Sequence, residues 1–256
     1  ENNFHGRTTT IISFSNDPVA RDGFGPFTGG FIKIPYDDSA ALEETLNNNS
    51  TIAAFLVEPI QGEAGVYVPS EGYLAKAKAL CEAHNVLFIA DEVQTGIART
   101  GRLLATCGNC SCEKKDCSGT PEVKPNILIL GKALSGGVYP VSAVLANDSI
   151  MNVITPGSHG STFGGNPIAA AVAMAALKAV KDEDLTENAY RLGNLFRASL
   201  NTYIEASTIV KSVRGKGLLN AILINDHEES DTAWNICWII WIGWRRHWIS
   251  LMMMSI

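Results

Sequence analysis

The sequence predicts an α/β protein in which a mostly parallel sheet is sandwiched by helices. Short, almost wholly apolar runs alternate with segments of helical periodicity. Two of these runs end in a carboxylate, which is typical of central parallel strands covered on both faces. The length of 256 residues and the 46% hydrophobic content are sufficient for the core of one large domain or of two small ones.

The first half of the chain contains a predicted strand, helix and strand. The apolar runs TIAAFLVEP (51–59) and NVLFIADE (85–92) are predicted to be the strands. Between them, residues 70–84 form a predicted helix, and we expect Ser70 to cap it. The helical spacing is carried by Leu74, Ala77 and Cys81. This order predicts a parallel βαβ unit.

The second half continues the alternation. Further strands are predicted at 126–131, 140–147 and 217–224. A helix is predicted over 166–180, because Asn166 and Pro167 stand where a helix cap and a first turn favour them. Residues 184–206 form a long amphipathic pattern and predict a second helix. The sequence contains no internal repeat.

Composition and charge limit the classes of partner. The net charge is −6 and basic residues are scattered until the very end of the chain, so no basic face for nucleic acid is predicted. No apolar stretch reaches the roughly eighteen residues of a membrane span. The first residues lack the charged-then-apolar pattern of a secretory signal. We therefore expect small-molecule partners, with neither nucleic acid nor membrane.

Four of the six cysteines are clustered in the sequence CGNCSCEKKDC, as Cys107, Cys110, Cys112 and Cys117. This spacing is compatible with a zinc knuckle or a disulfide. The cluster has no second Cys-x-x-Cys and no paired histidine, so we favour a polar surface insertion at about 106–120 and predict no metal site. Cys81 and Cys237 are expected to be ordinary buried thiols.

Reactive side chains follow three of the predicted strands. They are Glu58 and Glu63 after the first, Asp91 and Gln94 after the second, and Lys132 after the third. Binding sites in open α/β sheets lie at the carboxyl ends of strands. There an amine can form a Schiff base with a carbonyl at a poorly solvated strand end, and an aspartate can hold a pyridine nitrogen protonated. Surface charges that merely end the strands are the alternative from spacing alone.

Six motifs together resemble the class III pyridoxal-phosphate aminotransferases, in order along residues 1 to about 237. They are FHGRT, VEPIQGEAG, LFIADEVQTGIARTGR, NILILGKALSGG, HGSTFGGNP and VRGKGLLNAI. DGFGPFTGGFIKIPYDD and YPVSAVLANDSIM are most similar to the members that act on L-ornithine.

The resemblance implies a fold-type I large domain, pyridoxal 5'-phosphate as cofactor, and transfer of the δ-amino group of L-ornithine to 2-oxoglutarate. The products would be glutamate 5-semialdehyde and L-glutamate, in arginine and proline metabolism. Acetylornithine or another ω-amino acid is the alternative substrate.

The resemblance also implies roles for individual residues around the cofactor ring. Lys132 would form the Schiff base with the cofactor and then move a proton between the substrate carbon and the cofactor's C4′. Asp91 would pair with the pyridine nitrogen. Gln94 would hydrogen-bond the phenolic oxygen, and Phe4 would stack on the ring face.

Substrate contacts follow from the same resemblance. Arg7 would bind the α-carboxylate of the substrate, because a guanidinium matches a carboxylate bidentately. Glu63 would neutralise a substrate-binding arginine while the ω-amino group is handled, and release it for the keto acid. Glu58, next to Pro59, is expected to support the end of its strand.

Two hydroxyl side chains are assigned to the cofactor phosphate. Ser161 and Thr162 would donate to it from the neighbouring subunit, which implies a homodimer with a shared active site. His5 and His159 belong to the motifs, and for each of them a structural role is the expectation.

Relative to the family pattern, we expect residues 1–205 to form a cofactor-binding large domain without its N-terminal part. Residues 206–232 would begin a C-terminal small domain. The resemblance ends before WIIWIGWRRHWISLMMMSI, and all five tryptophans lie between Trp234 and Trp248. Our hypothesis is that residues 233–256 are an aberrant tail, from out-of-frame translation or a misjoined exon. A membrane-contacting amphipathic tail is the alternative.

Such a chain has a further alternative function, that of a non-catalytic truncated remnant with exposed apolar surface. Family members occur in mitochondria and in cytosol, so the resemblance implies either the mitochondrial matrix or the cytoplasm.

Overall fold

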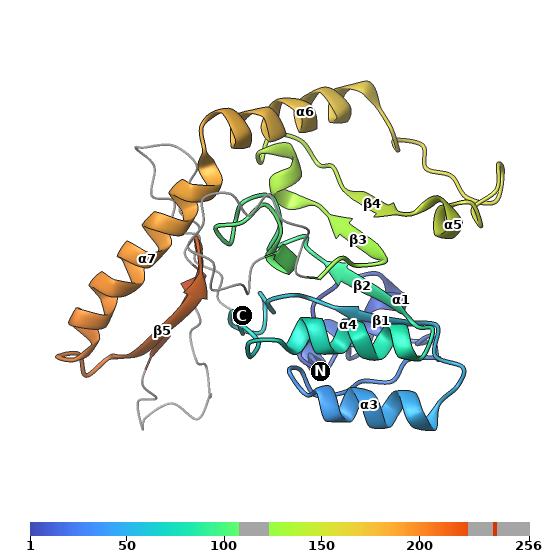
Figure 1. Cartoon of the computed structure of the whole chain (residues 1–256), viewed down its shortest axis with the longest axis horizontal. Helices are drawn as coiled ribbons and strands as arrows, with labels where there is room; N and C mark the ends of the chain where they lie inside the picture. Colours follow the sequence, from blue (N-terminus) through green and yellow to red (C-terminus); the bar gives the residue numbers. More distant parts are fainter. Residues whose placement is uncertain (108–122, 225–237, 240–256) are drawn as a thin grey trace.

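A computed structural model describes residues 1–107, 123–224 and 238–239, which form two sheets flanked by helices (Figure 1). The first sheet has the strand order β1-β2-β3-β4, and the second has the order β5-β6-β7. The strands of the first sheet are β1 (Ala54–Val57), β2 (Leu87–Asp91), β3 (Ile127–Leu130) and β4 (Ala143–Ala146). Those of the second are β5 (Val210–Lys216), β6 (Leu219–Ile224) and β7 (Trp238–Ile239).

The first sheet confirms the predicted α/β class with a mostly parallel sheet. Strands β1, β2 and β3 are parallel, and β4 runs antiparallel to β3. The register pairs Leu56 with Ile89 and Asp91 with Ile129. The carboxyl ends of β2 and β3 therefore lie side by side, and this edge carries the residues described below.

One hydrophobic core lies between the first sheet and two helices, α3 (Ser39–Asn48) and α4 (Tyr73–Ala83). Helix α4 packs against β2 and α3 packs on α4 (Figure 1). Core side chains from these elements include Leu42, Leu46, Leu74, Ala77, Cys81 and Phe88. The helical spacing found in the sequence thus marks the buried face of α4, and Cys81 is a buried free thiol.

The predicted cap of α4 is wrong. Gly72 occupies the N-cap position with φ 82°, and no side chain caps the helix. Ser70 is instead bound to Asp37, since its hydroxyl donates to Oδ1 at 2.7 Å and its backbone N–H donates to Oδ2 at 2.9 Å. The hydroxyl and the N–H of Ser70 are therefore both bound to a carboxylate 33 residues earlier in the chain, and Ser70 does not cap the helix.

The helices α6 (Pro167–Asp182) and α7 (Leu185–Ile204) confirm the other two helix predictions. The Asn166 side chain accepts the N–H of Ala169 at 2.8 Å, and Pro167 occupies the first turn. In Figure 1, α7 lies along β5, against which it packs.

The antiparallel strand β5 was not predicted. Its sequence VKSVRGK has only two apolar residues, and their spacing of three resembles a helix more than a strand. Strand β5 is instead stabilised by its antiparallel pairing with β6, in which Lys216 lies opposite Leu219 across a tight turn. Gly217 in that turn has φ 54°, a conformation that glycine adopts readily.

Short elements were also missed, because a four-residue helix is too short to show periodicity. They are α1 (Thr9–Ile12), α2 (Pro18–Arg21), α5 (Asp148–Met151) and the 3-10 helices η1 (Ala105–Cys107) and η2 (Lys132–Ser135). The ten-residue helix α3 was also missed, although its sequence contains a helix-start signal. Asp38 is its N-cap, and the Asp38 side chain accepts the N–H groups of Ala40 and Ala41.

Several predictions fall outside the described residues. They concern Cys110, Cys112, Cys117 and Cys237, and nearly all of the tail at 233–256. Within the described ranges, none of the helices has the length and apolar character that a membrane crossing requires. The division at residue 205 stays a prediction.

Candidate active site

The candidate active site lies where β2 and β3 end next to each other. Asp91 is the last residue of β2 and pairs with Ile129 of β3. The next N–H, that of Glu92, donates to the Ile129 carbonyl at 2.9 Å. Strand β3 ends at Leu130, so Lys132 follows two residues later at the same edge. Parallel pairing therefore brings the predicted carboxylate and the predicted amine to neighbouring strand ends.

The backbone at Lys132 is unusual. This residue begins η2 with φ 41°, in the left-handed region that non-glycine residues rarely adopt. Its neighbours Gly131 and Ala133 are buried, whereas Lys132 itself is exposed. The expected poor solvation of the amine is therefore wrong for this structure, because the side chain extends out from the sheet edge. Strained backbone of this kind is concentrated at functional sites.

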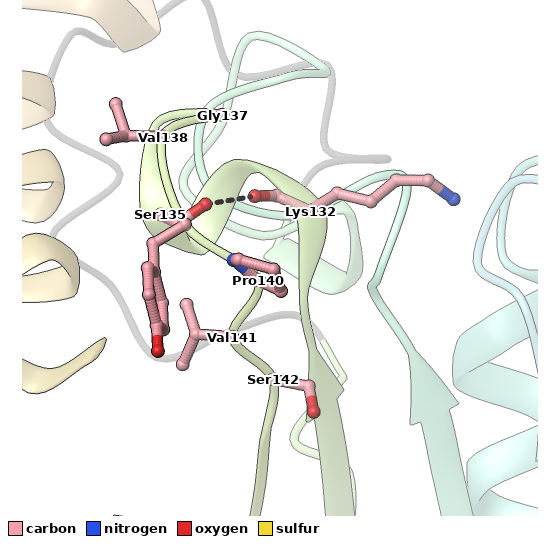
Figure 2. A pocket seen from close by; sticks show the side chains of 8 residues that line it. Lys132, Ser135, Gly137, Val138, Pro140, Val141 and Ser142 are labelled. Atoms are coloured by element: carbon pink, nitrogen blue, oxygen red, sulfur yellow. Dashed lines mark hydrogen bonds between the residues drawn. The ribbon is translucent and has the colours of Figure 1, made fainter. Parts of the chain in front are cut away.

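Figure 2 shows the surroundings of Lys132. The residue lines an open hollow of about 580 Å³ with Ser135 and residues 137–142. Its carbonyl accepts the Ser135 hydroxyl at 3.3 Å, while the aliphatic chain carries the amine away from Val138 and Pro140 (Figure 2). The amine is thus free to reach a molecule beyond the strand ends.

Asp91 is held by two neighbours. His5 Nδ1 lies 2.7 Å from Oδ2, and the Val93 N–H donates to Oδ1 at 3.0 Å. The His5 and Asp91 side chains are only 4% and 8% exposed, so the pair is shielded from water. Sequence reasoning gave His5 no partner, because 86 residues separate it from Asp91. The available signal was its place directly after Phe4 in FHGRT.

Glu58 connects the end of β1 to the segment that carries Phe4. Its Oε2 accepts the Phe4 N–H at 2.9 Å, and its Oε1 accepts the Gly62 N–H at 3.3 Å. The guanidinium carbon of Arg7 lies 5.3 Å from the Phe4 ring centroid. Arg7 is exposed and Phe4 is half-buried.

Burial raises the pKa of the Glu58 carboxyl from 4.5 to about 7, although the two N–H donors and His5 favour its ionised form. The folded state therefore retains this proton at pH values where the unfolded chain releases it. We expect the free energy of unfolding to fall by at most about 3 kcal/mol as pH rises from about 4.5 to about 7. Asp91 and His5 are the titratable groups that face this carboxyl.

Glu58→Gln should flatten that slope, because the amide does not titrate. Urea unfolding across this pH range measures it, with exposed Glu44→Gln as the matched control. An unchanged slope in Glu58→Gln would contradict the assignment. Burial also raises the pKa of the Glu92 carboxyl. Glu92 contributes equally to the pH dependence of wild type and of Glu58→Gln, so its contribution cancels when the two slopes are compared.

Gln94 and Glu63 form a second pair beside the same strand ends. Gln94 Nε2 donates to Glu63 Oε1 at 3.0 Å. A Cβ atom at Gly62 would lie 2.4 Å from Gln94 Oε1, so glycine is needed for the amide to lie there. The structure thus brings Glu63 to Gln94.

The remaining predicted site residues lie elsewhere. Ser161, Thr162 and His159 are exposed, on the segment between α5 and α6 that extends from the body of the protein in Figure 1. The Ser161 hydroxyl oxygen accepts the Gly164 N–H at 3.0 Å. The structure therefore does not bring these residues to Lys132 within one chain.

Over residues 1–107 and 123–224, no group of three or more potential metal ligands is found.

The mixed sheet, the lysine at a strand end and the buried aspartate at the adjoining strand define a fold-type I aminotransferase domain, the fold of the similar solved structures. The family Aminotransferase class-III matches residues 1–240, and the chain belongs to this family.

Among curated proteins, the chain is similar to "Ornithine aminotransferase, mitochondrial" of Drosophila melanogaster, with 56% identity over 92% of the chain and 51% of the relative. It is also 53% identical to "Ornithine aminotransferase car2" of Schizosaccharomyces pombe, over 93% of the chain and 53% of the relative. The chain therefore spans about half the length of the curated relatives it matches.

Two solved structures are similar as well. An ornithine aminotransferase from Toxoplasma gondii, described with partial occupancy of PLP at its active site, superposes with a TM-score of 0.81 at 50% identity, over 88% of this chain and 50% of that one. The acetylornithine aminotransferase from Elizabethkingia anophelis gives a TM-score of 0.73 at 64% identity, over 82% of this chain and 52% of that one.

Proposed function

We propose that the protein is a pyridoxal 5'-phosphate-dependent aminotransferase that transfers the δ-amino group of L-ornithine to 2-oxoglutarate. The products are glutamate 5-semialdehyde and L-glutamate. The observation that carries the proposal is the placement of Lys132 and the His5–Asp91 pair at adjoining strand ends. The similarity to ornithine aminotransferases of several organisms supports the choice of substrate.

The donor set at the strand ends fits the cofactor. Asp91 is a buried carboxylate held by His5 and Val93, so it can hold a proton on a heterocyclic nitrogen. Phe4 offers a half-buried aromatic ring to stack against, and Gln94 offers an amide donor for the phenolic oxygen. When bound, the cofactor supplies an electron sink for negative charge at the substrate carbon.

Lys132 has two roles in this proposal. Its Nζ would hold the cofactor, as an amine that can bond to an aldehyde. Once the substrate amine has displaced it, the same Nζ would act as the base that moves a proton at the substrate carbon. Its exposure in the structure leaves room for this movement.

Arg7 and Glu63 select the substrate. The exposed Arg7 guanidinium binds the α-carboxylate of the amino acid bidentately. Glu63 neutralises a substrate-binding arginine while the ω-amino group is handled, and then releases it for the keto acid 2-oxoglutarate. The hydrogen bond from Gln94 keeps the Glu63 carboxylate beside the cofactor site.

A second subunit completes the phosphate site in this proposal. Ser161 and Thr162 donate to the cofactor phosphate of the partner, which explains why they are exposed and distant from Lys132 in one chain. The adjacent Phe163 is 78% exposed and would be buried in such a homodimer.

The mitochondrial relatives of fly and rat support the mitochondrial matrix as one location, with the cytoplasm as the other.

The domain division is also part of the proposal. Residues 1–205 form the large domain around the first sheet, with an insertion at about 106–120, and residues 206–232 begin the small domain. The start of the second sheet at Val210, directly after α7, supports this boundary. The family match ends at residue 240, which supports an aberrant sequence within the proposed tail at 233–256.

Acetylornithine is the second candidate substrate. The acetylornithine aminotransferase from Elizabethkingia anophelis is 64% identical over 82% of the chain, a higher identity than that of the ornithine enzymes described above. The motifs at the strand ends therefore do not separate the two substrates, which differ by an acetyl group on the α-amine.

Borohydride labelling tests the proposal. The purified protein is incubated with pyridoxal phosphate and reduced, and the modified peptide is mapped. We expect the label on Lys132, and turnover of L-ornithine with 2-oxoglutarate that exceeds turnover of N-acetylornithine. Label at Lys132 with faster acetylornithine turnover would assign the second substrate. Absence of a stable adduct would instead favour a non-catalytic remnant.

A further inference from the structure

A seven-residue turn carries Glu63 and is closed at its base. Gln61 and Tyr67 exchange backbone hydrogen bonds of 3.1 and 2.9 Å, and the N–H groups of Gly65 and Val66 both donate to the Gly62 carbonyl at 3.0 Å. Gly65 and Val66 have φ values of 111° and 57°. This backbone is strained at Val66, so surrounding contacts must hold it.

The second sheet supplies those contacts. Val66 is fully buried in a cluster with Ile60 and with Leu219 and Ala221 of β6. Arg214 of the neighbouring β5 reaches the same turn from 149 residues away, and its Nε donates to the Gly65 carbonyl at 2.7 Å. Its guanidinium carbon also lies 3.7 Å from the Tyr67 ring centroid. The Arg214 side chain therefore contacts two residues in the second half of the turn, Gly65 and Tyr67.

These contacts lead to Glu63 in two steps. Arg214 fixes the carbonyl of Gly65, two residues after Glu63, and the turn then places Glu63 Oε1 within 3.0 Å of Gln94 Nε2. The Gln94 amide in turn lies against Gly62, where a Cβ atom would be 2.4 Å from its Oε1. We propose that Arg214 is a positioning residue that fixes the 61–67 turn and thereby the Glu63 carboxylate. This inference rests on the proposed function only in the role given to Glu63.

A rigid, planar guanidinium suits this position because it donates along one edge while its face stacks on an aromatic ring. Lysine can supply a charge and a donor there but not both geometries at once. The chain offers a matched control on the same strand, since Lys211 is exposed and its replacement by glutamine removes the same charge.

Hydrogen exchange tests the hold on the turn without requiring activity. In Arg214→Gln, we expect the amides of Gly65, Val66 and Tyr67 to exchange about tenfold faster, with α4 unchanged. Lys211→Gln should leave all of these amides at the wild-type rate. Wild-type exchange of the turn in Arg214→Gln would overturn the proposal.

Kinetics test the link to Glu63. With the cofactor bound, Arg214→Gln should lower kcat/KM for the amino acid about tenfold and leave cofactor retention unchanged, while Arg214→Lys should lose less than about threefold. In a Glu63→Gln background, the Arg214→Gln loss should disappear. An equal loss in both backgrounds would overturn the link. If wild type turns over neither substrate, the proposed function fails, and the exchange result alone decides whether Arg214 holds the turn.

Discussion

Lys132→Gln is expected to abolish aminotransferase turnover, with a loss of about 10³-fold or more, because one amine serves as both nucleophile and proton carrier. The side chain is exposed and its carbonyl, not its amine, makes the bond to Ser135, so the fold should be unaffected. Steady-state turnover of L-ornithine measures the loss. Thermal unfolding should occur at the wild-type temperature.

The matched control is Lys124→Gln, which removes an exposed lysine just before β3 and should keep full turnover. Borohydride reduction should leave pyridoxal label on wild type and on this control but not on Lys132→Gln. Addition of a small primary amine should restore part of the proton transfer in a Lys132→Ala protein. Undiminished turnover in Lys132→Gln would show that another group carries the chemistry.

Gly193→Ala is expected to destabilise the fold by about 3 kcal/mol or more, although alanine favours a helix over glycine by about 1 kcal/mol. A Cβ at this position in α7 would lie 1.9 Å from the Gly217 carbonyl oxygen. Arg197 donates to that oxygen at 3.0 Å, and the next N–H, of Leu218, donates to Arg99 at 2.9 Å. Moving the turn away from α7 would lengthen the bond from Arg197, and the backbone of residues 99–101 already lies close to Gly217. Urea unfolding measures the change.

Gly29→Ala is the control for this experiment. A Cβ at Gly29 meets no atom within 4 Å, and the backbone there does not need glycine. We expect a change within about 0.5 kcal/mol. A Gly193→Ala protein as stable as the control would contradict the close approach of α7 to the turn.

Much of the fold could be predicted because its determinants are local. The apolar runs of β1, β2, β3 and β6 are nearly continuous, and Asn166 with Pro167 marks the start of α6 without reference to other segments. The antiparallel β5 lacks such a run, and its stability comes from β6 and α7. Ser70 had an equally good local signal as a cap, yet Asp37 competes for it across 33 residues.

The site was predictable in part for the same reason. Strand ends can be read from the sequence, so Asp91 and Lys132 could be placed at one sheet edge before the structure was known. The His5–Asp91 and Arg214–Gly65 contacts join segments 86 and 149 residues apart, and no periodicity in either segment points to the other. The exposure of Lys132 likewise depends on packing, which sequence patterns do not describe.

The connection between β2 and β3 has a consequence for engineering. Thr106, buried and held through its N–H to Glu92 at 2.8 Å, accepts the Val123 N–H at 3.3 Å. The two described residues that flank positions 108–122 are therefore both buried, and a backbone hydrogen bond joins them. Because these bonds hold Thr106 and Val123 together, we expect an affinity tag or a fluorescent reporter inserted between them to leave the pairing of β2 with β3 unchanged.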